Sequence, residues 1–223
     1  MPMIEFRRPD GGLTPAYQTQ AARPDAPGVV VIQEWWGLNP QIRSVVDRLA
    51  AAGYTALAPD LYRGRLTTEA DEANHLMQSL DFVDATHQDL RGAAAHLAQG
   101  GQPVAVMGFC MGGALTVAAA VHVPGLAAAA CFYGVPPAHL AQPHAIAIPF
   151  QGHFAEQDDW CTPTVARGLE AEMRDAGRTP DIHFYPAGHG FFNATRAVYD
   201  AASAELAWQR LMNFFGRHLS APR

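Results

Sequence analysis

Short runs of β-branched and apolar residues alternate along this chain with longer segments of helical periodicity. Residues 29–34 (VVVIQE) are apolar at nearly every position, which is typical of a strand buried on both faces of a sheet. In segment 41–52 the apolar residues recur at helical spacing, and Gly53 marks the expected end of that helix. The alternation predicts an α/β protein whose mostly parallel, twisted sheet has helices on both faces.

The same alternation continues to the C-terminal part of the chain. We expect strands at 54–58, 103–108, 126–132, 146–151 and 181–185, and helices at 111–121, 163–176 and 194–218, with residues 67–99 forming two helices that break near Leu80. The first twenty residues differ, because Asp10-Gly11-Gly12 separates strands 4–8 and 16–20 and predicts an antiparallel hairpin at the sheet edge. Without repeats or a long linker, we expect residues 1–223 to form a single domain.

Composition narrows the classes of partner. The chain has 223 residues, of which 49% are hydrophobic, and a formal net charge of −6 with scattered Lys and Arg, which argues against nucleic acid or an anionic membrane. No apolar run approaches the ~20 residues that span a bilayer, and residues 1–10 carry charges and prolines instead of the apolar stretch of a signal peptide. Three cysteines do not make a disulfide framework. We expect a cytoplasmic protein, and a monomer and a small homo-oligomer both remain open.

The segment GFCMGG at 108–113 joins a predicted strand to a predicted helix. A G-x-nucleophile-x-G motif in this context holds its central side chain on a strained turn, and its glycines let strand and helix pass closely. Cys110 is therefore the candidate nucleophile, because the first amides of the helix favour its thiolate. The alternative is that Cys110 is a buried structural cysteine at a glycine-rich helix start. Cys131, which lies inside an apolar strand, is interpreted as structural. Cys161 is interpreted as a bystander.

A candidate acid and a candidate base follow Cys110 along the chain, in the order nucleophile, acid, histidine that is expected of α/β-hydrolases. His189 lies in a glycine-flanked loop (YPAGHGF, 185–191) directly after the last predicted strand, where this architecture places its general base. The acid should come from the loop before it, which offers Asp158 and Asp159. Counting forward from the strand at 146 favours Asp158, and counting back from Pro163 favours Asp159. We predict Asp158, with Asp159 as the alternative.

The segment QEWWG at 33–37 ends an apolar strand and should face the Cys110 turn. A carboxylate there, Glu34, is costly unless it has a partner, although a cap of a helix or loop would also explain it. The backbone amides of Trp35 and Met111 are placed to form an oxyanion hole. Trp35 and Trp36 are predicted to be exposed aromatics at a pocket mouth, with packing under the sheet as the alternative.

Together these motifs resemble the dienelactone hydrolase family, also called carboxymethylenebutenolidases. The resemblance rests on a colinear set: QEWWG at 33–37, APDLY at 58–62, GFCMGG at 108–113, HFAEQDDW at 153–160 and GHGFFN at 188–193. It implies the α/β-hydrolase fold and a triad of Cys110, His189 and Asp158, with Glu34 engaging the resting thiol and assisting thiolate formation. It also implies attack on a lactone or ester carbonyl, a thioester intermediate and its hydrolysis by water.

The resemblance says less about substrate contacts. The best-known members hold a substrate carboxylate with arginines, one of them four residues after the catalytic histidine, where this chain has Asn193. Arg196 is the arginine nearest to that position, and Arg63 and Arg65 are possible substitutes for the other arginine. We expect a small lactone or carboxylic ester as substrate, contacted by Asn193, Arg63 and Arg196. Four aromatic residues are predicted to complete the substrate site: Trp36, Phe109, Tyr133 and Phe191.

Other functions could use the same residues. A thioesterase or acyltransferase would employ the same triad with a different acceptor. A non-catalytic, ligand-binding α/β-hydrolase predicts a broken triad, whereas every role is filled here. A metal site built from His153, Asp158, Asp159 and His189 lacks a compact ligand-spacing motif, so we expect no metal and no other cofactor.

Overall fold

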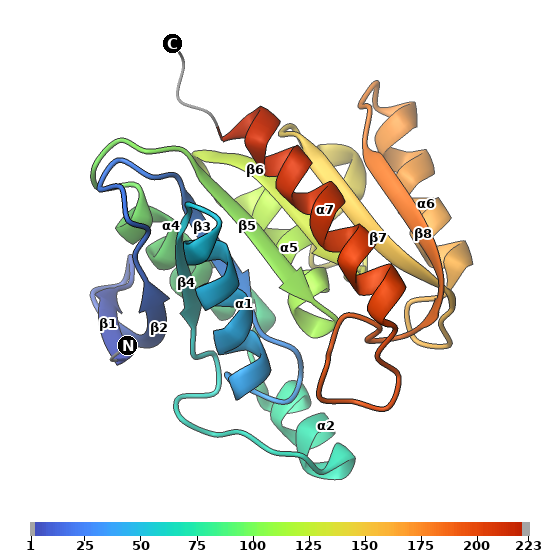
Figure 1. Cartoon of the computed structure of the whole chain (residues 1–223), viewed down its shortest axis with the longest axis horizontal. Coiled ribbons are helices and arrows are strands. Elements are labelled where there is room, and N and C mark those ends of the chain that lie inside the picture. The colour runs from blue at the N-terminus through green and yellow to red at the C-terminus, as the bar shows by residue number, and fades with distance from the viewer. Residues whose placement is uncertain (1–2, 220–223) are drawn as a thin grey trace.

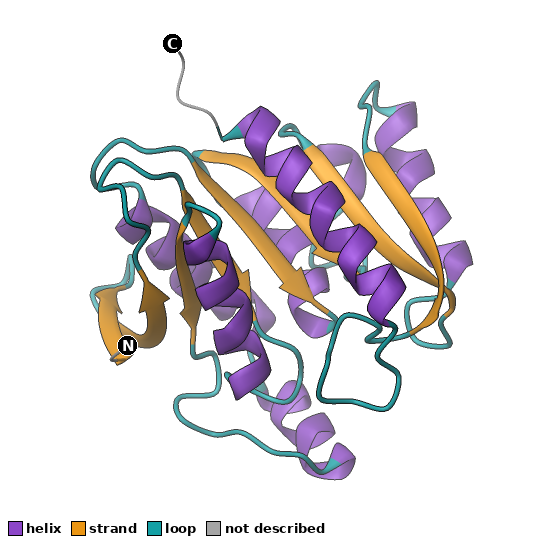
Figure 2. Cartoon of the chain, viewed as in Figure 1, coloured by secondary structure: helices purple, strands orange, loops and turns teal. Residues whose placement is uncertain are grey.

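An eight-stranded sheet runs through the molecule and carries helices on both of its faces (Figure 1, Figure 2). This computed structural model describes residues 3–219. The strand order is β1-β2-β4-β3-β5-β6-β7-β8. The six strands from β3 to β8 pair in parallel, whereas β2 is antiparallel to both β1 and β4. The predicted fold class, a mostly parallel sheet with an antiparallel edge hairpin, is confirmed.

The strands are β1 (Met3–Arg7), β2 (Leu13–Thr19), β3 (Gly28–Ile32), β4 (Thr55–Pro59), β5 (Val104–Phe109), β6 (Leu126–Phe132), β7 (Phe150–Gln157) and β8 (Asp181–Gly188). The helices are α1 (Pro40–Ala51), α2 (Ala70–Ser79), α3 (Phe82–Asp84), the π-helix η1 (Ala85–Leu90), α4 (Arg91–Leu97), α5 (Met111–His122), the 3₁₀-helix η2 (Pro143–Ala145), α6 (Pro163–Asp175) and α7 (Ala201–His218). The predicted break at Leu80 lies between α2 and α3.

Two apolar layers cover the two faces of the sheet. Because successive residues of a strand point to opposite faces, Val30 and Ile32 of β3 pack into the layer that contains residues of α4, α5 and α6. Val29 and Val31 pack into the other layer, with residues of α1 and α7. Figure 1 shows α1 and α7 on the near side of the sheet and α5 on the far side. This two-sided burial explains why β3 is apolar at every position.

Strand β7 differs from the predicted strand at 146–151. It begins at Phe150 and continues to Gln157, so most of the predicted HFAEQDDW loop is strand. The hydrophobic pattern missed it because two of its buried residues are polar. His153 is fully buried, with its Nε2 atom 2.9 Å from Oε1 of Gln151 and its Nδ1 atom 2.7 Å from the Tyr185 hydroxyl. These polar groups pair with each other, and the strand can bury them.

The last helix also differs, because α7 begins at Ala201 and not at residue 194. The intervening residues form successive turns, in which the amide of Arg196 donates to the Asn193 carbonyl and the amide of Asp200 donates to the Phe191 carbonyl. The Asn193 side chain accepts from the amide of Thr195, a local bond that competes with helix formation. A loop therefore stands where helical periodicity predicts a helix.

Glycines allow α5 to begin in direct contact with neighbouring strands. A Cβ atom on Gly112 would lie 2.5 Å from the carbonyl oxygens of both Ile32 and Gln33. A Cβ atom on Gly113 would lie 2.3 Å from the carbonyl oxygen of Phe132. These partners are backbone atoms that cannot rotate away, so the start of α5 can approach β3 and β6 this closely only without side chains.

We therefore expect Gly112→Ala to destabilise the protein by ~1–3 kcal/mol, the usual cost of overpacking. The matched control is Gly168→Ala in the exposed part of α6, where an added Cβ would meet nothing within 4 Å. That change should stabilise the helix by ~0.5–1 kcal/mol, because alanine loses less backbone entropy on folding. Thermal unfolding followed by circular dichroism measures both, and a Gly112→Ala melting temperature equal to or above the wild type would contradict the described contact.

Candidate active site

Cys110 occupies the turn between β5 and α5 in a strained backbone conformation. Its φ of 55° and ψ of −117° lie where residues with a side chain are rare. The turn is held because the amide of Cys110 donates to the Phe132 carbonyl and its own carbonyl accepts from the amide of Ala114. The half-buried thiol therefore stands at the carboxyl end of the sheet, where the sequence motif placed it.

His189 follows β8 and is bound to Asp158. Its Nδ1 atom lies 2.8 Å from Oδ2 of Asp158, whose side chain is fully buried. The other carboxylate oxygen of Asp158 accepts from the amides of Trp160 and Cys161. Asp159, the alternative acid, is exposed and makes no hydrogen bond to the histidine. Of the two aspartates, the structure brings Asp158 against the histidine.

The electrostatics of His189 reflect both of its neighbours. Burial lowers the pKa of the imidazole, but the hydrogen bond to Asp158 and the interaction with Cys110 outweigh it and raise the pKa to about 10. The Nε2 atom is buried and has no hydrogen-bond partner among residues 3–219 within ordinary hydrogen-bond geometry. This nitrogen is therefore available to the thiol or to a bound substrate.

Glu34 lies just beyond the end of β3, and its side chain is buried. Its carboxylate accepts hydrogen bonds from Nδ2 of Asn193 at 2.5 Å and from the Tyr133 hydroxyl at 3.3 Å. Burial raises the pKa of Glu34, and these hydrogen bonds and the charge of His189 only partly oppose it. The resemblance to known hydrolases implied a contact with the resting thiol, but the hydrogen bonds found for Glu34 go to Asn193 and Tyr133.

Strands β3 and β5 are parallel neighbours, so their carboxyl ends meet at one edge of the sheet. Trp35 follows the first strand, and Met111 is the first residue of the helix after the second. An amide in the first turn of a helix has no partner within the helix. The two backbone segments expected to bind an oxyanion therefore lie at the same edge as Cys110.

A cavity of about 460 Å³ opens at this edge. Cys110, His189 and Glu34 lie in its wall, together with the three tryptophans Trp35, Trp36 and Trp160. The Trp35 ring lies 5.0 Å from that of Trp36 and 5.5 Å from that of Trp160. Trp36 is buried, in contrast to the predicted exposed aromatic, and the Arg196 guanidinium lies 4.1 Å from its ring.

Several expected substrate contacts lie elsewhere. Phe109, Tyr133 and Phe191 are buried and do not line this cavity, and Phe109 stacks on Phe192 below it. Arg63 also lies outside the cavity, with its guanidinium 2.7 Å from Asp89. Of the expected residues, Trp36, Asn193 and Arg196 do line it.

Sequence reasoning missed some of the wall. Trp160 and Met77 both line the cavity. Trp160 stands next to the candidate acids and could have been suspected from that position. Met77 belongs to α2. No sequence motif near Met77 indicates a site, because only the folding of the chain brings α2 to the cavity.

Across residues 3–219 no group of three or more His, Cys, Asp or Glu side chains could hold a metal ion. His153, one member of the alternative metal set, is buried within the sheet and bonded to Gln151 and Tyr185. Nor does any helix in this range combine the length and hydrophobicity that crossing a bilayer requires.

Comparisons with known proteins identify the family and agree with the fold. Residues 14–219 match the model of the dienelactone hydrolase family. The chain is 33% identical to the Escherichia coli K12 protein named "Putative carboxymethylenebutenolidase", over 93% of this chain and 84% of that protein. It is 30% identical to "Protein usf" of Aquifex pyrophilus, over 98% and 99% of the two chains.

A solved structure from Klebsiella pneumoniae, named as a putative dienelactone hydrolase, superimposes with a TM-score of 0.85. The two chains are 28% identical, and the superposition covers 97% of this chain and 98% of that one. Since the family model matches nearly the whole chain and the fold agrees, the chain belongs to the dienelactone hydrolase family and is a hydrolase of the α/β-hydrolase fold.

Proposed function

We propose that this hydrolase cleaves a lactone or small carboxylic ester, with Cys110 as the nucleophile and a thioester as the intermediate. The observation that carries the proposal is the hydrogen bond between Asp158 and His189, together with the position of His189 and Cys110 in the wall of one cavity. Because Asp158 and Cys110 raise the pKa of His189 to about 10, the imidazole carries its proton near neutral pH and can stabilise a negative charge beside it. A thiolate is the reactive form of cysteine.

In the first half of the reaction, the Cys110 thiolate attacks the carbonyl carbon of the substrate. The negative charge that develops on the carbonyl oxygen is bound by the amides of Trp35 and Met111. As the tetrahedral intermediate collapses, the bond to the alcohol oxygen breaks and Nε2 of His189 gives that oxygen its proton. In a lactone the alcohol remains attached to the acyl group.

In the second half, water hydrolyses the thioester. His189, now neutral, accepts a proton from the water while its oxygen attacks the thioester carbonyl. Collapse releases the carboxylic acid and restores the thiolate beside the imidazolium. Asp158 keeps the imidazole oriented throughout, because its two oxygens are fixed by backbone amides and by Nδ1 of His189.

Glu34 has a supporting role in this proposal. It lines the same cavity as Cys110, and burial raises its pKa, so it can take up the proton that leaves a neutral thiol. Asn193 and Tyr133 hold the carboxylate in place during this transfer. The side-chain amide of Asn193 is engaged with Glu34. Among residues 3–219, this leaves Arg196 as the arginine of the cavity wall that could meet an anionic substrate group.

Cys110→Ala should lower kcat/KM for a dienelactone and for p-nitrophenyl acetate at least about a thousandfold, as expected when a nucleophile is removed. Cys110→Ser should also be strongly impaired, because a hydroxyl must give up its proton during attack. Steady-state hydrolysis measures both, and intact-mass spectrometry should find an acyl group on the wild type only. Cys161→Ala, which removes a buried thiol outside the cavity, is the control. Full activity of Cys110→Ala would refute the proposal.

Glu34→Gln should make the protein more stable above pH 7 and less active. The folded state binds the Glu34 proton more tightly than the unfolded state, so wild-type stability rises as the pH falls from the folded pKa toward its ordinary value near 4.5. Glutamine carries no charge to bury, and each unit of raised pKa is worth about 1.4 kcal/mol.

The measurement is the melting temperature of wild type and Glu34→Gln between pH 8 and pH 5. The advantage of the variant should be largest at pH 8 and shrink toward pH 5. Glu156→Gln, at the exposed end of β7, is the matched control and should show no such trend. An advantage that stays constant with pH would mean that Glu34 carries no unfavourable charge.

A further inference from the structure

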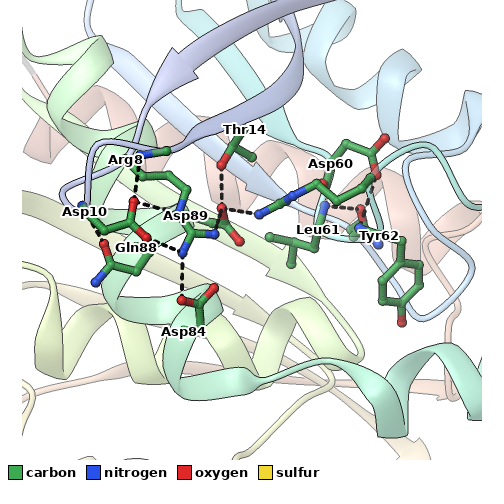
Figure 3. Close-up of polar contacts among 12 residues, drawn as sticks. Arg8, Asp10, Thr14, Asp60, Leu61, Tyr62, Asp84, Gln88 and Asp89 are labelled. Carbon is green, nitrogen blue, oxygen red and sulfur yellow. Dashed lines mark hydrogen bonds and ion pairs between the residues drawn. The ribbon is translucent and has the colours of Figure 1, made fainter.

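Outside the cavity, a buried carboxylate joins three segments of the chain. The Asp89 side chain, in the π-helix η1, is only 2% exposed. Its Oδ1 atom accepts from the Thr14 hydroxyl at 2.5 Å, from Nη2 of Arg63 at 2.7 Å and from Nη1 of Arg8 at 3.3 Å (Figure 3). A buried charge is tolerated only with such partners. Asp89 therefore ties the hairpin of β1 and β2 to the loop that follows β4.

Arg63 fixes the conformation of that loop. It has a φ of 54°, a left-handed value that a long side chain rarely adopts. Besides its bond to Asp89, its guanidinium donates through Nη1 to the carbonyl of Asp60 at 2.7 Å. The Asp60 carboxylate in turn accepts from the amides of Tyr62 and Gly64 (Figure 3). The turn at 60–64 is thus stabilised by hydrogen bonds to both the carbonyl and the carboxylate of Asp60, and Arg63 links the turn to Asp89.

The loop that contains Arg63 also contacts the backbone segment that carries the Trp35 amide of the proposed oxyanion hole. The amide of Leu61 donates to Oε1 of Gln33 at 3.2 Å, and the amide of Thr67 donates to the carbonyl of Trp36 at 3.1 Å. These two bonds hold the chain on either side of Trp35.

Two closer contacts complete this clamp. The Tyr62 hydroxyl lies 3.3 Å from the sulfur of Met111, the residue that supplies the second amide. The carbonyl of Arg65 lies so near Gly37 that a Cβ atom there would be 2.6 Å from it. The position of loop 60–67 therefore sets the position of the Trp35 amide, and the loop also contacts the Met111 side chain.

From these contacts we infer that Arg63, held by Asp89, is a positioning residue for the oxyanion hole, and that it does not contact the substrate. The inference rests on the proposed function, because that proposal assigns the oxyanion to the amides of Trp35 and Met111. Loss of the Arg63 link frees loop 60–67 and lets the amide of Trp35 drift from the attacked carbonyl, whereas the amide of Met111 stays with the start of α5. The thiol and imidazole, which this loop does not hold, keep their arrangement.

The test is Arg63→Met, assayed in two reactions. Hydrolysis of p-nitrophenyl acetate needs the oxyanion hole, and removal of one oxyanion donor typically costs 10²–10³ in kcat. We expect a loss of about tenfold to a hundredfold in kcat, with KM changed less than about threefold, because one amide is displaced and not deleted. Alkylation of Cys110 by iodoacetamide forms no oxyanion, so its rate should stay within about twofold of the wild type.

The control is Arg23→Met, which removes an exposed ion pair with Asp25 outside loop 60–67 and should leave both rates unchanged. Arg63→Lys, which keeps a cation beside Asp89, should recover part of the lost kcat. Asp89→Asn should resemble Arg63→Met, whereas Asp84→Asn should not, since Asp84 pairs with Arg8 and not with Arg63.

The inference is overturned if Arg63→Met hydrolyses the ester at the wild-type rate, or if alkylation falls as far as hydrolysis does. Arg63 is 39% exposed, so its replacement leaves a folded protein to assay even if Asp89→Asn does not fold. Failure of the proposed function has a different signature, namely a Cys110→Ala variant that remains active whatever Arg63→Met does.

Discussion

The contact of α5 with β3 is the constraint on which the site depends. Because Gly112 has no side chain, the start of the helix lies directly against the carbonyls of Ile32 and Gln33. That contact sets how far the turn at Cys110 stands from the chain that continues into Glu34 and Trp35. The nucleophile, the buried carboxylate and one oxyanion amide thus share a single backbone-to-backbone contact, which no side-chain rearrangement can loosen.

Three of the buried carboxylates, Asp158, Asp89 and Glu34, differ in their partners, and their partners determine what each can do. Asp158 is bound by two amides and by His189, so it acts as a fixed orienting charge. Asp89 is surrounded by a hydroxyl and two guanidinium groups, so it joins segments of the fold. Glu34 has only neutral hydrogen-bond donors, so its charge is poorly compensated and its pKa is raised. Only this third arrangement suits a group that exchanges a proton.

Much of the fold and the centre of the site could be predicted from the sequence, because both have local signals. The Cys110 turn and the His189 loop are marked by glycines within a few residues, and the mostly parallel sheet with helices on both faces follows from strand and helix alternation. The acid remained open between Asp158 and Asp159 because adjacent residues differ only in how the loop turns. The role of Arg63 was missed, since its partner Asp89 is 26 residues away. Strand β7 was cut short because its polar residues pair only in three dimensions.

The residue four positions after His189 shows how chemistry and specificity can separate within one site. An arginine, which the family resemblance led us to look for at this position, would pair with Glu34 and hold its pKa down. Asn193 supplies a hydrogen bond without a charge, so Glu34 stays easy to protonate. The positive charge stands instead at Arg196, stacked on Trp36 in the cavity wall. A substrate anion would therefore be drawn toward the tryptophan wall and away from Glu34, while the attacked carbonyl stays at Cys110.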